Sequence, residues 1–131
     1  MRFRIWIPAV LAGAIVVVLS LPVQGHHSIP TFFNVETTIS ISGVLREVKI
    51  ANPHASFIVE VTEPSNVAGK WVGIGANAVS MTKTGWTNET VKLGTKVTVV
   101  GNPPRREGAK TLVIKTLTNA DGKVFVFGNP G

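Results

Sequence analysis

Histidine is the residue type in this chain whose placement most clearly suggests chemistry. The chain has three histidines and no cysteine, and the histidines fall in two places. His26 and His27 are adjacent, and His54 directly follows Asn52-Pro53. Imidazole nitrogens bind Cu(II), Ni(II) and Zn(II), and affinity normally peaks at copper. The sequence therefore predicts a metal site built from His26, His27 and His54, with Cu(II) favoured over Zn(II) or Ni(II).

A structural explanation of the same histidines stays open. Histidines near a chain terminus are commonly solvated, and His54 can simply cap its own turn. The three residues also lack the carboxylate spacing of a recognised metal motif. In this alternative the protein binds no metal.

The first 25 residues have the pattern of an export signal. Arg2 and Arg4 precede a run without charge at residues 5–23, and Val23-Gln24-Gly25 gives a small-residue exit. This order is typical of a cleaved secretory signal peptide at 1–25, which makes the mature protein periplasmic or secreted and without a membrane attachment. The alternative is an uncleaved anchor, because roughly 20 apolar residues can span a bilayer.

Cleavage would create metal ligands that the precursor lacks. A cut after Gly25 leaves His26 with a free amine beside its own imidazole, a bidentate chelate. A cut one residue earlier leaves Gly25-His26-His27, in which the amine, the intervening amides and the third imidazole suit a square-planar metal. His54 would complete the set if the arm at residues 26–36 folds over the first hairpin, and Phe32 and Phe33 provide an apolar reason for that fold.

Residues 37–131 have the strand periodicity of a small β-barrel. Apolar residues alternate within short segments, and turn-forming residues separate the segments. Strands are predicted near residues 37–51, 56–62, 70–76, 95–101, 110–118 and 123–127. Asn77 and Gly85 bracket the one predicted helix, at 77–84, as N-cap and C′ residue. Three strands, a helix and further strands are the order of an all-β, OB-like antiparallel barrel of five to six strands; a β-sandwich is the alternative.

The side-chain alternation also predicts which residues form the core. The first strand changes its apolar parity around Gly43, where we expect a bulge or bend. In the third strand we place Val72, Ile74 and Ala76 on the inner face and Trp71 on the outer face. The predicted core comprises Ile39, Ile41, Val44, Val48, Ile50, Phe57, Val59, Val61, Val72, Ile74, Val97, Val99, Leu112 and Ile114.

The sequence favours binding over catalysis. It contains no cysteine nucleophile, no Gly-x-Ser-x-Gly and no glycine-rich phosphate loop between a strand and a helix. Glu36 and Glu47 are the only obvious candidates for a general base beside His54. A metal-dependent enzyme therefore remains only as an alternative to a non-catalytic binding module.

Nucleic acid is not the expected partner. The formal charge of +6 falls to +4 without Arg2 and Arg4, with 11 basic against 7 acidic residues. An OB-like barrel could bind nucleic acid through Phe57, Trp71 and the loop residues Arg105, Arg106 and Lys110. A modest positive charge is weak evidence for nucleic-acid binding, however, and export would remove the chain from cytoplasmic nucleic acid. A small ligand or an envelope protein, peptide or glycan is the more plausible partner.

Three motifs in a fixed order resemble a known family. His26-His27-Ser28, Asn52-Pro53-His54 and Gly85-Trp86 are similar to the motifs of small exported bacterial proteins of unknown function. Members often carry an aromatic residue after Asn-Pro-His, where this chain has Ala55, and a Leu-x-Pro-Gly turn, where it has Leu93-Gly94 without proline. The resemblance spans nearly the whole mature chain. It implies an OB-like fold and export, and it brings no established activity.

The signal-peptide interpretation predicts a defined N-terminus. We expect the exported protein to begin at or near His26, because signal peptidase cuts after small residues that follow an apolar run. N-terminal sequencing of protein recovered from the cell envelope measures this directly. A protein that keeps Met1 and fractionates with the membrane would contradict the prediction.

Overall fold

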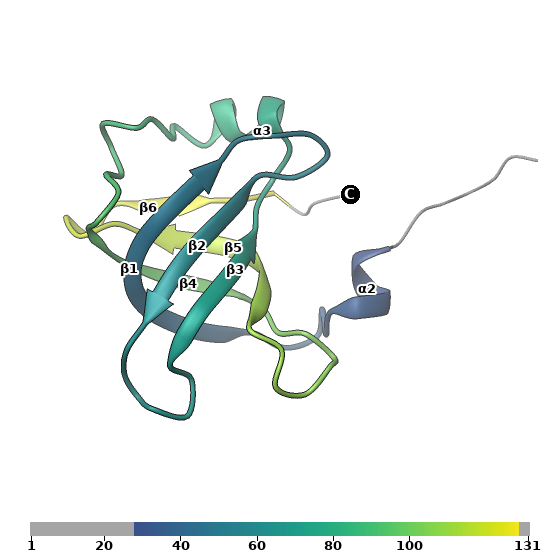
Figure 1. Cartoon of the computed structure of the whole chain (residues 1–131). Coiled ribbons are helices and arrows are strands. Elements are labelled where there is room, and N and C mark those ends of the chain that lie inside the picture. Colours follow the sequence, from purple (N-terminus) through teal and green to yellow (C-terminus); the bar gives the residue numbers. More distant parts are fainter. Residues whose placement is uncertain (1–27, 129–131) are drawn as a thin grey trace, which may run out of the picture.

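A computed structural model of the chain describes residues 28–128. Six strands and two short helices make up this part, and Figure 1 shows the strands curving around one interior, with α2 to the side of the barrel. No helix among the described residues has the length and apolarity needed to cross a membrane. In chain order the elements are α2 (Ile29–Phe32), β1 (Ile39–Lys49), β2 (Ser56–Val61), β3 (Gly69–Ile74), α3 (Ala78–Lys83), β4 (Lys96–Asn102), β5 (Thr111–Thr118) and β6 (Val124–Val126).

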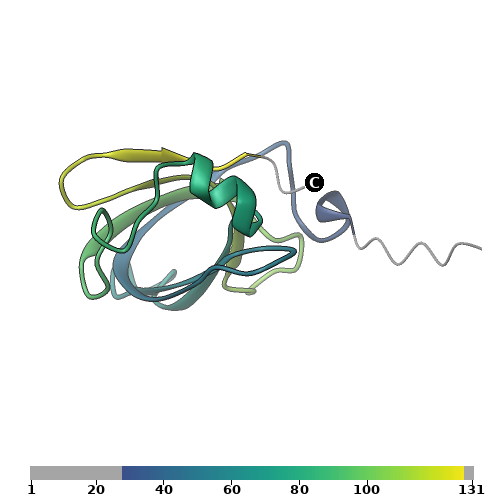
Figure 2. The same cartoon turned by 90° about the horizontal axis from the view of Figure 1, so that it is seen from above.

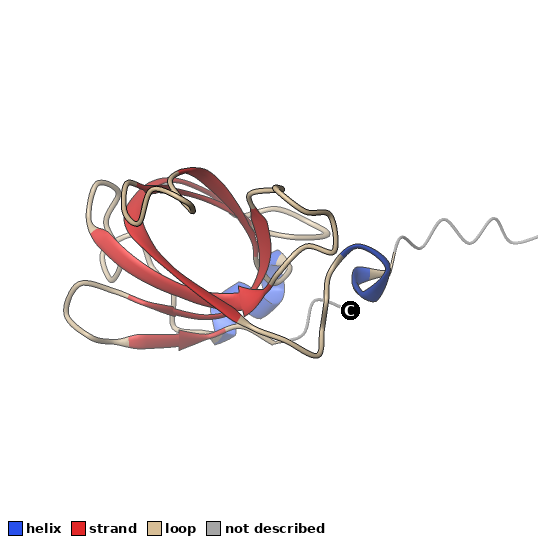
Figure 3. Ribbon diagram, turned by 90° about the horizontal axis from the view of Figure 1, so that it is seen from below, coloured by secondary structure: helices blue, strands red, loops and turns tan. Residues whose placement is uncertain are grey.

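The strands close into a small barrel. Their order in the sheet is β3-β2-β1-β4-β5-β6, and β3 also pairs in parallel with β5, so that the first five strands form a ring. Figure 3 shows this ring from below, with β6 continuing the sheet beyond it. The predicted all-β, OB-like barrel with one helix between the third and fourth strands is confirmed.

The long first strand bends so that it can pair with two partners. Its first half pairs with β4, from Ile39 opposite Gly101 to Val44 opposite Lys96. Its second half pairs with β2, and the register shifts between Leu45 and Glu47. The predicted parity change exists, but it lies at Arg46 and not at Gly43. Leu45 consequently enters the core in place of Val44, which is only half-buried.

The predicted phase of the third strand is wrong. Trp71 is buried with 7% of its surface exposed, whereas Val72 is 38% exposed. The cause is the pairing with β2, which sets Gly73 opposite the fully buried Phe57. A Cβ at Gly73 would lie 2.6 Å from Ile114 Cδ1, so large side chains from other strands already fill this space. Because an inner position of β3 is a glycine, the strand lacks the alternation of apolar and polar side chains that normally identifies the inner face.

Most of the remaining predicted core is confirmed. Ile50 is an error, because it lies beyond the end of β1 and is 43% exposed. Ile39, Val44, Val48 and Ile74 are half-buried. The predicted residues that are buried are Ile41, Phe57, Val59, Val61, Val97, Val99, Leu112 and Ile114.

Helix α3 begins and ends where its capping residues predict. The Asn77 side chain accepts a hydrogen bond from Ser80 N at 2.8 Å, and Gly85 has φ +78 just after the C-cap Thr84. Met81 is buried, whereas Val79 is 64% exposed. Figure 2 shows α3 lying across one open end of the barrel, where it covers the core.

Like Gly101, Gly43 lies at a position where the barrel leaves no room for a side chain. A Cβ there would overlap the carbonyl oxygen of Glu60 and lie 2.9 Å from Val59 Cγ1. We expect Gly43→Ala to destabilise the protein by about 1–3 kcal/mol, because β1 must move away from β2 to make room. Urea unfolding followed by circular dichroism measures the change.

Gly128→Ala is the matched control, because a Cβ at Gly128 meets nothing within 4 Å. Its effect should stay within about 0.5 kcal/mol. Equal stabilities for the two variants would show that the close approach of β1 to β2 does not constrain residue 43.

Candidate functional site

The turn that carries His54 is fixed to its surroundings by hydrogen bonds on both sides. Asn52 Oδ1 accepts the Ala78 N–H at 3.1 Å, which satisfies a free amide at the start of α3. Ala55 N donates to Ala76 O at 2.8 Å, and Gly75 N donates to Ala55 O at 2.8 Å. The Asn-Pro-His turn therefore has a structural role, since it joins the β1–β2 hairpin to the start of α3.

The His54 ring has one buried nitrogen with no bonding partner. The residue is half-buried, and its Nδ1 is enclosed without a hydrogen bond to any described residue. A buried N–H without an acceptor is costly, so this setting favours a ring proton on Nε2 over one on Nδ1. Metal binding through Nε2 would move that proton to Nδ1, where metal-bound imidazoles normally have a hydrogen-bond acceptor. The described residues supply none.

Trp86 presents a second buried nitrogen of the same kind. Its Nε1 has no partner among residues 28–128. The ring packs edge-on against Phe57 at 5.2 Å and against Phe125 at 5.5 Å between centroids, and Phe57 also contacts Phe127 at 5.5 Å. The sequence indicated Trp86 only as part of the Gly85-Trp86 motif. It did not reveal this aromatic cluster, because Phe125 in β6 and Phe127 just after it are far from Phe57 in sequence and meet it only in the folded barrel.

The N-terminal arm docks on the loop between β4 and β5. Phe33 is 7% exposed and forms a β-bridge with Pro104. Asn34 N donates to Pro103 O at 2.9 Å, and Arg105 N donates to Phe32 O at 2.8 Å. The expectation that the arm folds over the first hairpin is therefore wrong for the described part of the arm. Phe33 provides the expected apolar contact, but with a different loop.

Two further side chains secure the arm. Arg105 Nε donates to Pro30 O at 2.9 Å. The buried Asn102 donates from Nδ2 to Thr37 O at 2.7 Å and to Val35 O at 3.3 Å. Arg105 was one of the basic residues considered for nucleic-acid binding. Its side chain instead has a structural role, since it bonds the arm.

The docked arm and the histidine turn lie at different ends of β1. The arm leads into Ile39, where β1 begins beside the end of β4, and His54 follows Lys49, where β1 ends. Figure 1 shows the β1–β2 turn beside α3 at the top and the β4–β5 loop at the bottom. His26 and His27 lie outside the described residues, so their position relative to His54 remains a prediction.

The described residues bring no complete metal or catalytic set together. Residues 28–128 contain no group of three histidine or acidic side chains that could hold a metal ion. Glu36 and Glu47, the two candidate bases, are exposed and make no hydrogen bond with His54. Phe57 and Trp71 are buried, so neither ring is available to stack on a nucleic-acid base.

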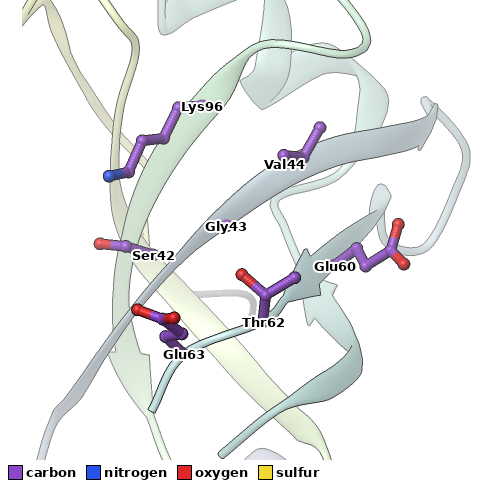
Figure 4. A pocket seen from close by; sticks show the side chains of 7 residues that line it. All are labelled: Ser42, Gly43, Val44, Glu60, Thr62, Glu63 and Lys96. Carbon is purple, nitrogen blue, oxygen red and sulfur yellow. The ribbon is translucent and has the colours of Figure 1, made fainter. Parts of the chain in front are cut away.

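A polar groove crosses the outer surface of the barrel where β1 leaves β2. Its volume is about 420 Å³. Figure 4 shows Gly43 in the middle, with polar side chains from β1, β4 and the end of β2 around it. Ser42 Oγ bonds Thr98 Oγ1 at 2.8 Å and Glu60 pairs with Arg46 at 2.6 Å. The lining residues are Ser42, Gly43, Val44, Glu60, Thr62, Glu63 and Lys96.

Comparison with known proteins identifies a family and no activity. The model of the family of unknown function DUF6152 matches residues 13–113. The matched segment contains the histidine pair, the Asn-Pro-His turn and the barrel as far as the first part of β5. No curated protein matches the chain.

The contact between the turn and α3 gives a prediction about stability. Asn52→Ala removes the acceptor for Ala78 N and should cost about 1 kcal/mol of unfolding free energy, in the range of lost N-caps. Hydrogen exchange of the Ala78 amide should accelerate. Chemical denaturation and exchange measured by NMR test both effects.

Asn66→Ala is the matched control, because Asn66 is exposed in the β2–β3 loop and makes no hydrogen bond. It should leave both measurements unchanged. An Asn52→Ala protein as stable as the wild type would show that this cap does not hold the turn.

Proposed function

Since the chain belongs to this family of unknown function, we propose its function from its own geometry: an exported, non-catalytic binding module that holds a divalent transition metal, with copper favoured, at its processed N-terminus. The ligands are the terminal amine and the imidazoles of His26 and His27. His54 is retained as a third histidine ligand of this set. The protein acts in the periplasm or outside the cell.

The observation that carries this proposal is the anchoring of the arm. The described arm residues, 28–36, bury Phe33 and make backbone hydrogen bonds to Pro103 and Arg105. Ordering such a segment costs conformational entropy of roughly 1–2 kcal/mol per residue, which these contacts must offset. The result is that the arm is attached to the barrel from Pro30 onward, close in sequence to the predicted chelate at His26. A fixed attachment point reduces the ordering cost of metal binding.

The ligand chemistry supports a nitrogen-preferring metal. A terminal amine, imidazoles and deprotonated amides suit the square-planar or tetragonal geometry of Cu(II) or Ni(II). The chain has no cysteine, which leaves nitrogen and oxygen as the strong ligands. Metal binding requires the unprotonated forms of these groups, so affinity should fall as the pH is lowered.

His54 is the weakest member of the proposed set. Its turn lies at the end of β1 away from the docked arm, and its buried Nδ1 lacks the acceptor that would orient a metal-bound ring. His54 joins the N-terminal ligands only if residues 26 and 27 of the same chain reach this end of β1. A single substitution, His54→Ala, therefore tests whether His54 belongs to the ligand set.

The polar groove is the basis for a second candidate function. Thr62, Glu63 and Lys96 line it without a hydrogen bond or ion pair to other described residues. Hydroxyl, carboxylate and ammonium groups on an open surface suit the hydroxyls of a glycan or the main chain of a peptide. This function needs no metal, so a copper titration distinguishes it from the metal-binding function.

The metal proposal is tested by copper titration of the correctly processed protein. Adding one alanine before the mature N-terminus moves the amine away from His26, and we expect affinity to fall at least about tenfold, which corresponds to about 1.4 kcal/mol of binding free energy. His26→Ala and His27→Ala should change the nitrogen hyperfine pattern in electron paramagnetic resonance. Competition with a chelator of known affinity gives the constants.

His54→Ala distinguishes the histidines from one another. An affinity unchanged by this variant alone removes His54 from the ligand set and leaves the N-terminal site intact. Unchanged affinity in the N-terminal variants as well would overturn the proposal. The wild-type protein should also lose copper as the pH falls, and a pH-independent affinity would contradict binding by imidazole and amine.

A further inference from the structure

Strand β6 is the open edge of the sheet. It pairs with β5 through Thr116–Val126, Leu117–Phe125 and Thr118–Val124, and it has no other strand partner among residues 28–128. It lies after residue 113, where the match to the family ends. The edge is therefore a feature of this chain that the family match does not describe.

The hydrogen bonds on either side of β6 show which backbone groups are free. Phe127 N donates to Lys115 O at 2.8 Å, and Asn119 N donates to Lys123 O at 3.0 Å. Residues that exchange hydrogen bonds alternate along an antiparallel pair, so Lys123, Phe125 and Phe127 face β5. The N–H and C=O groups of Val124 and Val126 consequently point away from β5, toward the open edge.

This edge lacks most of the features that prevent strands from pairing. Natural proteins protect edges with charges, prolines, bulges or short strands. The segment from Val124 to Phe127 has no charge and no proline, and its pairing with β5 runs without a register shift. Its only protection is its length of three residues. The side chains of Val124 and Val126 are 53% and 66% exposed, which is unusual for paired apolar residues on a strand.

We propose that a second copy of this chain pairs with this edge, β6 against β6 in antiparallel orientation, with Phe125 on the two-fold axis. Val124 of one protomer then lies opposite Val126 of its partner, and the reverse. Each of these two pairs exchanges two backbone hydrogen bonds, because the groups that point outward belong to these residues. The exposed valines of both protomers come together on one face of the joined sheet.

The charge pattern favours a second copy over an unrelated strand. In this register Lys123 lies opposite Phe127 of the partner, so the two lysines stand at opposite ends of the contact. Lys123 Nζ already lies 5.1 Å from the centroid of Phe125, a cation–π contact within its own chain. No like charges face each other, and the one charged side chain at this edge, Lys123, is already engaged by Phe125 of its own chain. A two-fold contact of one surface with itself is also the commonest form of homodimer.

A charge-swap experiment tests the edge and the register together. One variant carries Val124→Lys and Val126→Lys, and the other carries Val124→Glu and Val126→Glu. Each variant alone sets like charges opposite each other at both pairs and should be monomeric. A mixture of the two sets each introduced lysine opposite an introduced glutamate and should restore the dimer. Sedimentation velocity over a wide concentration range measures the mass.

The controls separate the contact from effects on folding. Both positions are exposed, and far-ultraviolet circular dichroism should show wild-type folds. Val72→Lys places a lysine on an exposed valine of β3, where both neighbouring strands, β2 and β5, are already paired, and it should leave dimerisation unchanged. Val126→Pro removes only an outward N–H, as edge prolines do, and should weaken the dimer in a folded protein.

Each outcome decides the proposal. A concentration-dependent wild-type dimer, abolished in either charged variant and restored in their mixture, supports it. A wild type that stays monomeric at every concentration overturns it, even if it captures an added extended peptide. A dimer that persists in the double-lysine variant also overturns it, because the interface would then lie elsewhere.

Discussion

The close passage of β1 over β2 is the constraint on which the rest of the barrel depends. One strand must pair with β4 through its first half and with β2 through its second half, or the ring does not close. Gly43 makes this passage possible because the carbonyl of Glu60 occupies the place of a side chain. The register shift at Arg46 then turns the end of the strand, and Leu45 and Val48 both reach the core. The bend also opens the groove around Gly43 where β1 and β2 separate.

The same residues show what could be predicted from the sequence and what could not. Helix α3 was predictable because Asn77, Gly85 and their spacing act locally, within one or two turns of the chain. The phase of β3 was not, because Gly73 and Gly75 carry no side chain and the space beside them is filled by Phe57 and Ile114 from other strands. Alternation of apolar residues reports the inner face only where both faces have side chains. Trp71 was misplaced for this reason.

The candidate site was predictable in its residue types and not in its assembly. The histidines can be read directly from the sequence as candidate nitrogen ligands, and the export signal that would create the terminal amine remains a prediction. Which segment holds the arm cannot be read in that way, since Phe33 packs on Pro104 about seventy residues later in the chain. Asn52 was similarly read with His54 as one motif. Its side chain instead caps α3, so this residue has a structural explanation that is independent of any ligand of His54.

The docked arm and the proposed dimer contact of β6 lie near opposite ends of the same strand, β5. The arm docks on the loop that leads into Thr111, whereas β6 pairs with residues Thr116 to Thr118 at the other end. Neither contact uses a residue of the other, and the core residues Leu112 and Ile114 lie between them. Substitutions of exposed residues that are this far apart normally act additively. A metal-binding defect should therefore leave self-association unchanged, and a monomeric β6 variant should bind copper as the wild type does. A change of both properties in one variant would instead indicate that the barrel itself has been disturbed.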